Sequence, residues 1–418
     1  MKSRPLLLLA AAALLFAAGT VIVLTTRGNG SRAEEDFRGQ IADKTISAGR
    51  LELLDVAYAA ASALPIAPHG KNRSRAQHEV VEACLELDQP ERALESTEGI
   101  SDWRRSLGYA QFAEYCARNE QPAVAERYVS LAERVMKSFE HEETFQDWQK
   151  GQIQAAIART LFRLGEGERA RAVESAVVET ESSRVLAAEA RPMDAAEFDS
   201  RLAAAGELLK VGSLDRIQPA LETLTELFNR WYSDSERRTL AEETIKSNWK
   251  KVPVALAVDI AEKLAKSALD HGDTAEALEQ YREGKALVDG ARWAPEDHIP
   301  VSSRMAALRY RCGEVEAARQ DIAACVATFD EKRESIFDVF RAGALRPVAE
   351  AYAAVGDRTA ALETYRRAVL EGSVNVNARP RAQDLVATCV SMAIHDVEPD
   401  AALWARIRDI RAELGDPW

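Results

Sequence analysis

Apolar residues recur at helical spacing along almost the whole chain. From about Leu51 to Leu414 they fall three or four positions apart, and short turns with an acidic residue, Gly or Pro interrupt them. This period is typical of amphipathic α-helices, whereas apolar positions alternate in half-buried strands. The pattern therefore predicts an all-α protein whose helices are joined by short turns.

One spacing of small and aromatic residues is repeated within these helices. Its clearest copy has members 7, 12, 16 and 19 positions after a small residue, namely Ala349, Gly356, Ala361, Tyr365 and Ala368. Small residues let two helices approach closely, and Gly accepts the left-handed backbone that ends many helices. The spacing therefore predicts antiparallel helix hairpins. Further copies are Ala265, Gly272, Ala277, Tyr281 and Gly284; Ala306, Gly313, Ala318, Ile322 and Cys325; Ala158, Gly165, Ala170 and Val177; Ala113, Glu120, Ala125, Val129 and Ala132; and, more weakly, Val81, Cys84, Asp88 and Ala93.

The spacing resembles the tetratricopeptide repeat, and the resemblance covers roughly residues 74 to 371. Equivalent Ala positions lie 45, 107, 41 and 43 residues apart, whereas the family repeats every 34 residues. The longest interval holds one degenerate unit around Ala205 and Gly212. The resemblance implies a right-handed α-solenoid of antiparallel hairpins with an irregular period.

The N-terminus carries an apolar segment at residues 6–26. Its 21 uncharged residues, at about 1.5 Å each, can cross a hydrocarbon core of about 30 Å. Lys2 and Arg4 precede it, whereas acidic residues offset the positive charges that follow it. We therefore expect a single-pass membrane protein whose bulk lies outside the cytoplasm, which in a bacterium is the periplasm. The alternative is a signal peptide cleaved near Ala18, which would give a secreted protein.

Three regions follow from these patterns. Residues 1–32 form the anchor or signal peptide, residues 33–190 a helical lead-in and the first hairpins, and residues 191–418 a second group. The boundary is placed where the repeat weakens, between Glu181 and Pro192.

Charge and cysteine content narrow the functional classes. The chain has 54 Lys and Arg against 67 Asp and Glu, a net charge of −13, which argues against general nucleic-acid binding. Its five cysteines include no CxxC pair, and Cys84, Cys116 and Cys325 fall at packing positions of the repeat. We therefore expect buried free thiols. Two Asp-Trp pairs, ending in Trp103 and Trp148, are expected to cap the preceding hairpins.

Signatures of catalysis are missing from the sequence. It contains no phosphate-binding glycine loop, no GxGxxG and no GxSxG. His78 and Glu82 share a helix face but lack the second His of a zinc protease. We therefore expect no enzymatic activity, catalytic residue, cofactor or metal. The open alternatives are a secreted helical enzyme or sugar-binding toroid, and a structural envelope protein without a fixed client.

The resemblance also implies a partner-binding groove on the first helix of each hairpin. Its basic and aromatic members would be Arg118, Arg159, Phe162, Arg163, Lys266, Tyr310, Arg311 and Arg346. Arginine can clamp a carboxylate through two hydrogen bonds, so an acidic segment or a free C-terminus of a partner protein would suit this groove. The alternative is that these are solvated charges balanced by neighbouring acids. The other members of the set are Glu114, Glu262, Asp270, Ser303 and Glu350.

The expected function is therefore a scaffold that is anchored in the membrane through residues 6–26 and binds a protein or peptide outside the cytoplasm. Such a chain is similar to the bacterial envelope proteins in which one transmembrane helix is followed by tetratricopeptide repeats.

Overall fold

A computed structural model describes residues 41–418, so the predicted anchor at residues 6–26 lies outside the described part. Nineteen α-helices and three short 3-10 helices follow one another in residues 41–418, and this part of the chain contains no strand. None of these helices is long and apolar enough to span a bilayer. The all-α prediction is confirmed.

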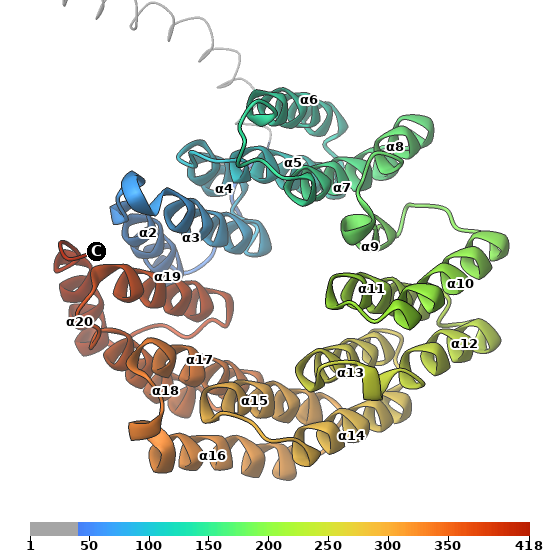
Figure 1. Cartoon of the computed structure of the whole chain (residues 1–418). Helices are drawn as coiled ribbons and strands as arrows, with labels where there is room; N and C mark the ends of the chain where they lie inside the picture. Colours follow the sequence, from blue (N-terminus) through green and yellow to red (C-terminus); the bar gives the residue numbers. More distant parts are fainter. Residues whose placement is uncertain (1–40) are drawn as a thin grey trace, which may run out of the picture.

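The helices form an inner and an outer layer (Figure 1). The inner layer consists of α3 (Ile66–Glu86), α5 (Arg104–Arg118), α7 (Asp147–Arg163), α9 (Ser182–Leu186), α11 (Leu214–Arg230), α13 (Val254–Asp270), α15 (Pro295–Arg311), α17 (Asp338–Ala354) and α19 (Ala378–Ile394). The outer layer consists of α4 (Pro90–Glu98), α6 (Pro122–Phe139), α8 (Gly167–Glu174), α10 (Ala195–Val211), α12 (Ser235–Lys246), α14 (Thr274–Gly290), α16 (Val315–Lys332), α18 (Arg358–Gly372) and α20 (Ala401–Ala412). The 3-10 helices are η1 (Glu179–Glu181), η2 (Trp249–Lys251) and η3 (Arg333–Ser335).

The predicted hairpin turns are present, and together with one further turn they share one backbone geometry. Each has a residue with positive φ, between 54° and 93°: Asp88, Glu120, Gly165, Gly212, Gly272, Gly313, Gly356 and Asp396. In seven of them the next amide donates to the carbonyl five residues back, as from Asp357 to Tyr352 at 2.9 Å. This bond satisfies a carbonyl at the end of the helix. The turn at Asp396, between α19 and α20, adds a hairpin beyond residue 371 that the sequence analysis missed.

The two ends of the array meet and close it into a ring. The helix α2 (Ala48–Ala63) packs along α19, and α3 also contacts α19 (Figure 1). Arg50 donates through Nε to the carbonyl oxygen of Ala393 at 2.7 Å, and Arg408 Nη2 lies 2.5 Å from Glu52 Oε1. The expected solenoid is therefore closed, which the repeat alone did not predict.

The inner helices are parallel to one another, with their N-termini at one edge of the ring and their C-termini at the other. Residues near their C-termini meet in neighbouring helices: Glu114 contacts Arg159, Asp270 contacts Arg311, and Glu350 contacts Ser391. One edge of the ring, here the N-terminal rim, therefore carries the N-termini of the inner helices, and the opposite edge, the C-terminal rim, carries their C-termini.

The packing positions of the repeat lie in the core as expected. Ala349, Ala361, Tyr365 and Ala368 are fully buried, and the Tyr365 hydroxyl lies 2.7 Å from Ser391 Oγ in the next hairpin. All five cysteines are buried and free, which confirms that prediction. Trp103 and Trp148 contact each other edge to face at 5.4 Å, so they join two neighbouring hairpins.

The regular alternation of long inner and outer helices is interrupted between α8 and α10. Only η1 and the five-residue helix α9 lie between these two helices. The core cluster of the first hairpins reaches Val185, and a second cluster starts at Phe198. The division of the chain into regions at residue 190 stays a prediction.

Candidate functional site

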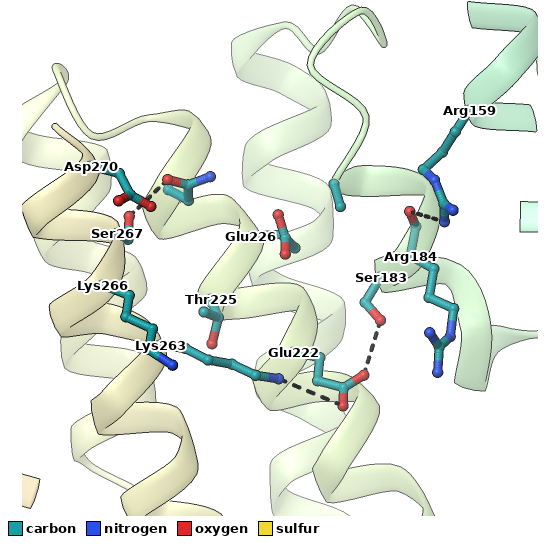
Figure 2. A pocket seen from close by; sticks show the side chains of 12 residues that line it. Arg159, Ser183, Arg184, Glu222, Thr225, Glu226, Lys263, Lys266, Ser267 and Asp270 are labelled. Carbon is teal, nitrogen blue, oxygen red and sulfur yellow. Dashed lines mark hydrogen bonds and ion pairs between the residues drawn. The ribbon is translucent and has the colours of Figure 1, made fainter. Parts of the chain in front are cut away.

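A deep hollow on the inner wall lies beside the short helix α9 (Figure 2). Helices α7, α11 and α13 each have 17 residues, whereas α9 has five, so the wall is incomplete between them. The resulting cavity has a volume of about 530 Å³. Its lining consists of Arg159, Ser183, Arg184, Ala187, Glu222, Thr225, Glu226, Asn229, Lys263, Lys266, Ser267 and Asp270.

A second cavity of about 510 Å³ adjoins the first on the side of α3 and α5. Arg159 lines both cavities, and its guanidinium forms two parallel bonds to Glu114, from Nε to Oε1 at 2.9 Å and from Nη2 to Oε2 at 2.6 Å. This half-buried pair separates the two cavities. The second lining consists of Glu82, Leu85, Glu86, Asp88, Gln111, Glu114, Tyr115, Arg118, Asn119 and Arg159.

The first cavity presents three cations that remain about half exposed. The side chains of Arg184, Lys263 and Lys266 are 52%, 51% and 49% exposed, and they pair with Glu181, Glu222 and Glu262, respectively. The Lys263 ammonium lies 4.0 Å from Glu222 Oε1, while Ser183 Oγ donates to the other oxygen of that carboxylate at 3.1 Å (Figure 2). These cations can therefore accept a further anionic partner from the cavity.

Glu226 projects into the same cavity from the C-terminal third of α11 (Figure 2). Burial raises the pKa of its carboxyl, and the nearby charges of Lys263 and Arg230 oppose that shift only in part. A carboxyl with a raised pKa is protonated at a higher pH than usual. The net charge of the residues that line this cavity therefore becomes more positive as the pH falls.

The second cavity has the opposite charge balance. Its lining holds the acids Glu82, Glu86, Asp88 and Glu114 against the cations Arg118 and Arg159. A hydrogen bond from Lys44 and another from Tyr115 lower the pKa of Asp88, so this carboxylate stays ionised at neutral pH. The inner wall is therefore more positive on one side of the Arg159–Glu114 pair, in the first cavity, and more negative on the other, in the second cavity.

The structure brings together part of the predicted groove. Arg118, Arg159 and Lys266 line the cavities, as do the acids Glu114 and Asp270. Arg311 lies nearby at the C-terminal rim, where its Nη2 is 3.3 Å from Asp270 Oδ1.

The remaining predicted residues lie outside both cavities. Phe162 is buried in the core with the Arg191 guanidinium 5.9 Å from its ring, so it is not part of the inner wall. Tyr310 packs against the core, and Ser303 is fully buried. Arg163 is half-buried without an ion pair among the described residues, whereas Arg346 lies 3.9 Å from Glu350 near the ring closure.

Several cavity residues were not found from the sequence. Ser183 and Arg184 lie on α9, which has no repeat spacing, and Glu222, Glu226 and Asn229 lie on α11 in the degenerate unit. One signal was available, because these last three residues are spaced four and three positions apart, which places them on one polar face of a helix.

His78 has local hydrogen-bonding partners. Its Nε2 lies 2.8 Å from Gln111 Oε1, and its Nδ1 lies 3.8 Å from Glu82 Oε2. Burial lowers the pKa of this imidazole. Within the part of the chain from residue 41 onward, no three His, Cys, Asp or Glu side chains are placed to hold a metal ion together.

No protein-family model matches the chain, and no curated protein matches its sequence.

Proposed function

We propose that this protein is a scaffold, anchored in a membrane through residues 6–26, whose ring lies outside the cytoplasm and binds a protein or peptide segment on its inner wall. The ring then has no chemistry of its own. We also propose that the hairpins belong to the tetratricopeptide class and wind in its right-handed sense. The observation that carries the proposal is the pair of joined cavities of opposite charge balance, which meet at Arg159.

The charges suggest how a partner segment would lie. An acidic stretch or a free C-terminus suits Arg184, Lys263 and Lys266 in the first cavity, because carboxylates form charge-assisted hydrogen bonds with such cations. Basic residues of the same segment suit Glu82 and Glu86 in the second cavity. Complementary potentials of this kind confer specificity and fast association more than affinity.

A sugar-binding toroid fits these cavities less well. Sugar sites commonly stack rings of the ligand on aromatic side chains, and the two linings contain one aromatic residue, Tyr115. That hydroxyl already donates to Asp88 Oδ1 at 3.0 Å. The charged character of the linings therefore favours a charged polypeptide as the ligand.

Charge reversal in the first cavity tests the proposed function. The double variant Lys263→Glu and Lys266→Glu should lose partner capture from detergent extracts, because it replaces the half-exposed cations with repelling carboxylates. The matched control, Lys250→Glu with Lys251→Glu, changes the net charge equally on the exposed helix η2 and should capture the partner normally.

Unchanged melting curves would show that both variants are folded. Equal capture by the two variants would contradict binding at the inner wall.

A further inference from the structure

Exposed apolar side chains are concentrated on one edge of the ring. Ten large hydrophobic residues are exposed among residues 41–418, and nine of them lie at the N-terminal rim, while the other, Leu240, is on α12. Ile66, Trp148 and Leu214 lie in the first turns of three inner helices. The other six, here the rim patch, lie at the start of α17 and the end of α18 with the loop that follows: Phe337, Val339, Phe340, Leu370, Val374 and Val376.

A hydrogen bond joins the two segments that carry the rim patch. Asn375 Nδ2 donates to Asp338 Oδ2 at 3.1 Å and so holds the loop after α18 against the start of α17. Asn375 is only 8% exposed, whereas Val374 and Val376 on either side of it are 55% and 77% exposed.

This loop reverses the usual rule, because its polar residue is inside and its apolar residues are outside. Exposed apolar area costs about 25 cal/mol per Å² relative to burial. The arrangement therefore indicates a surface that is covered in the working state.

Charges beside the patch are paired with one another. Arg333 holds Glu371 through Nε–Oε1 at 2.6 Å and Nη2–Oε2 at 3.0 Å, and its Nη1 lies 2.6 Å from Glu334. Lys332 pairs with Glu331 at 2.6 Å. Such pairing lowers the cost of bringing these charges close to an apolar phase. Asp338, within the patch, accepts hydrogen bonds from Val339 N–H and Asn375 Nδ2.

We propose that the rim patch inserts into the interfacial region of a lipid bilayer, so that the ring stands with its N-terminal rim on the membrane. This rests on the proposed anchor in the same chain, which would keep the ring at a bilayer. The patch consists of side chains at the start of α17, at the end of α18 and on the loop after α18, all at the edge of the ring. Apolar side chains at such an edge reach a planar interface together, and amphipathic surfaces bind membranes by burying them there.

The chain is long enough for this orientation. The described part starts at the C-terminal rim, where Lys44 N–H donates to the carbonyl of Asp88 at 2.9 Å. The 14 residues 27–40 between anchor and ring can span at most about 46–50 Å when extended. An inner helix of 17 residues is only about 25 Å long. The segment can therefore pass along the full height of the ring and still reach the bilayer.

A fluorescent probe in proteoliposomes tests the contact. The full chain is inserted into phosphatidylcholine vesicles in which some acyl chains carry a quenching spin label, and an environment-sensitive dye is attached at Val376→Cys. The five native cysteines are buried, so the introduced thiol is labelled selectively. Glu316→Cys on the C-terminal rim is the matched control, because its native side chain is 80% exposed.

We expect strong lipid quenching at position 376 and little at position 316. The triple variant Phe337→Ser, Phe340→Ser and Val374→Ser should abolish the quenching at position 376 while the chain still floats with the vesicles through its anchor.

The outcomes separate the two proposals. Equally weak quenching at both positions in a chain that floats would overturn the rim contact and leave the anchor standing. A chain that does not float and shows no quenching would overturn both. A change in dye emission at position 376 that needs an added protein, without lipid quenching, would overturn the lipid contact in favour of a protein contact.

Discussion

Replacing Leu53 with Ala is expected to lower the free energy of unfolding by about 2–5 kcal/mol, because the substitution leaves a cavity in a buried core. Leu53 is fully buried in α2, the helix that packs along α19 and joins the two ends of the ring. The size of this effect therefore reports whether α2 is a packed part of the ring.

Denaturant unfolding followed by circular dichroism would measure the change. Leu240→Ala is the matched control, because Leu240 is 41% exposed on α12 and should lose little. Equal transition midpoints for the two variants would mean that α2 is not packed against α19 in solution.

Replacing Ala361 with Phe is the second change with a large expected effect, a loss of about 1–3 kcal/mol from overpacking. Ala361 occupies the small position of α18 and is fully buried where α17 and α18 approach each other. The six additional heavy atoms of Phe cannot be accommodated there without moving one of the two helices.

Thr359→Phe is the appropriate comparison, since Thr359 is exposed in the first turn of the same helix and offers room for the ring. If the two variants unfold at the same midpoint, Ala361 is not the packing position that the repeat assigns to it in the last predicted hairpin.

Local features of the fold could be predicted because they are encoded within single hairpins. Gly272, Gly313 and Gly356 end inner helices with positive φ, as their place in the repeat suggests. The hairpin at Asp396 keeps the spacing of 7 and 12 residues at Cys389 and Ala401, but the position 19 residues after Cys389 is Arg408, where the identified copies have a small or apolar residue. Short polar side chains tolerate the left-handed region, so this turn needs no Gly.

Ring closure could not be read from the repeat. It depends on the summed rotation of successive hairpins and on contacts between residues far apart in sequence, such as Arg50 and Ala393. Neither quantity is contained in the spacing within one hairpin. A repeat pattern predicts which helices are neighbours in order, but not where the array ends.

The site could be predicted only in part, because the repeat spacing identifies some of its residues and is absent or degenerate around the others. Arg159, one position after the buried Ala158, does reach the inner wall. Phe162 follows the same Ala by four positions, which places it on the buried face of the helix, and it lies in the core. The cavity itself arises from the shortness of α9, and Arg184 and Glu226 belong to segments in which the repeat is absent or degenerate.

Cross-linking of the two ends tests the closed ring most directly. Glu52 and Arg408 lie 356 residues apart in sequence, and their side chains form an ion pair across the closure. With both changed to Cys, a short bismaleimide should join them within one chain in dilute solution and alter its migration in denaturing gels. A pair of cysteines at positions 52 and 240 should remain unlinked, because they belong to α2 and α12, which lie on opposite sides of the ring (Figure 1). Failure of the first pair to link within the chain, under conditions that label both thiols, would contradict the closed ring.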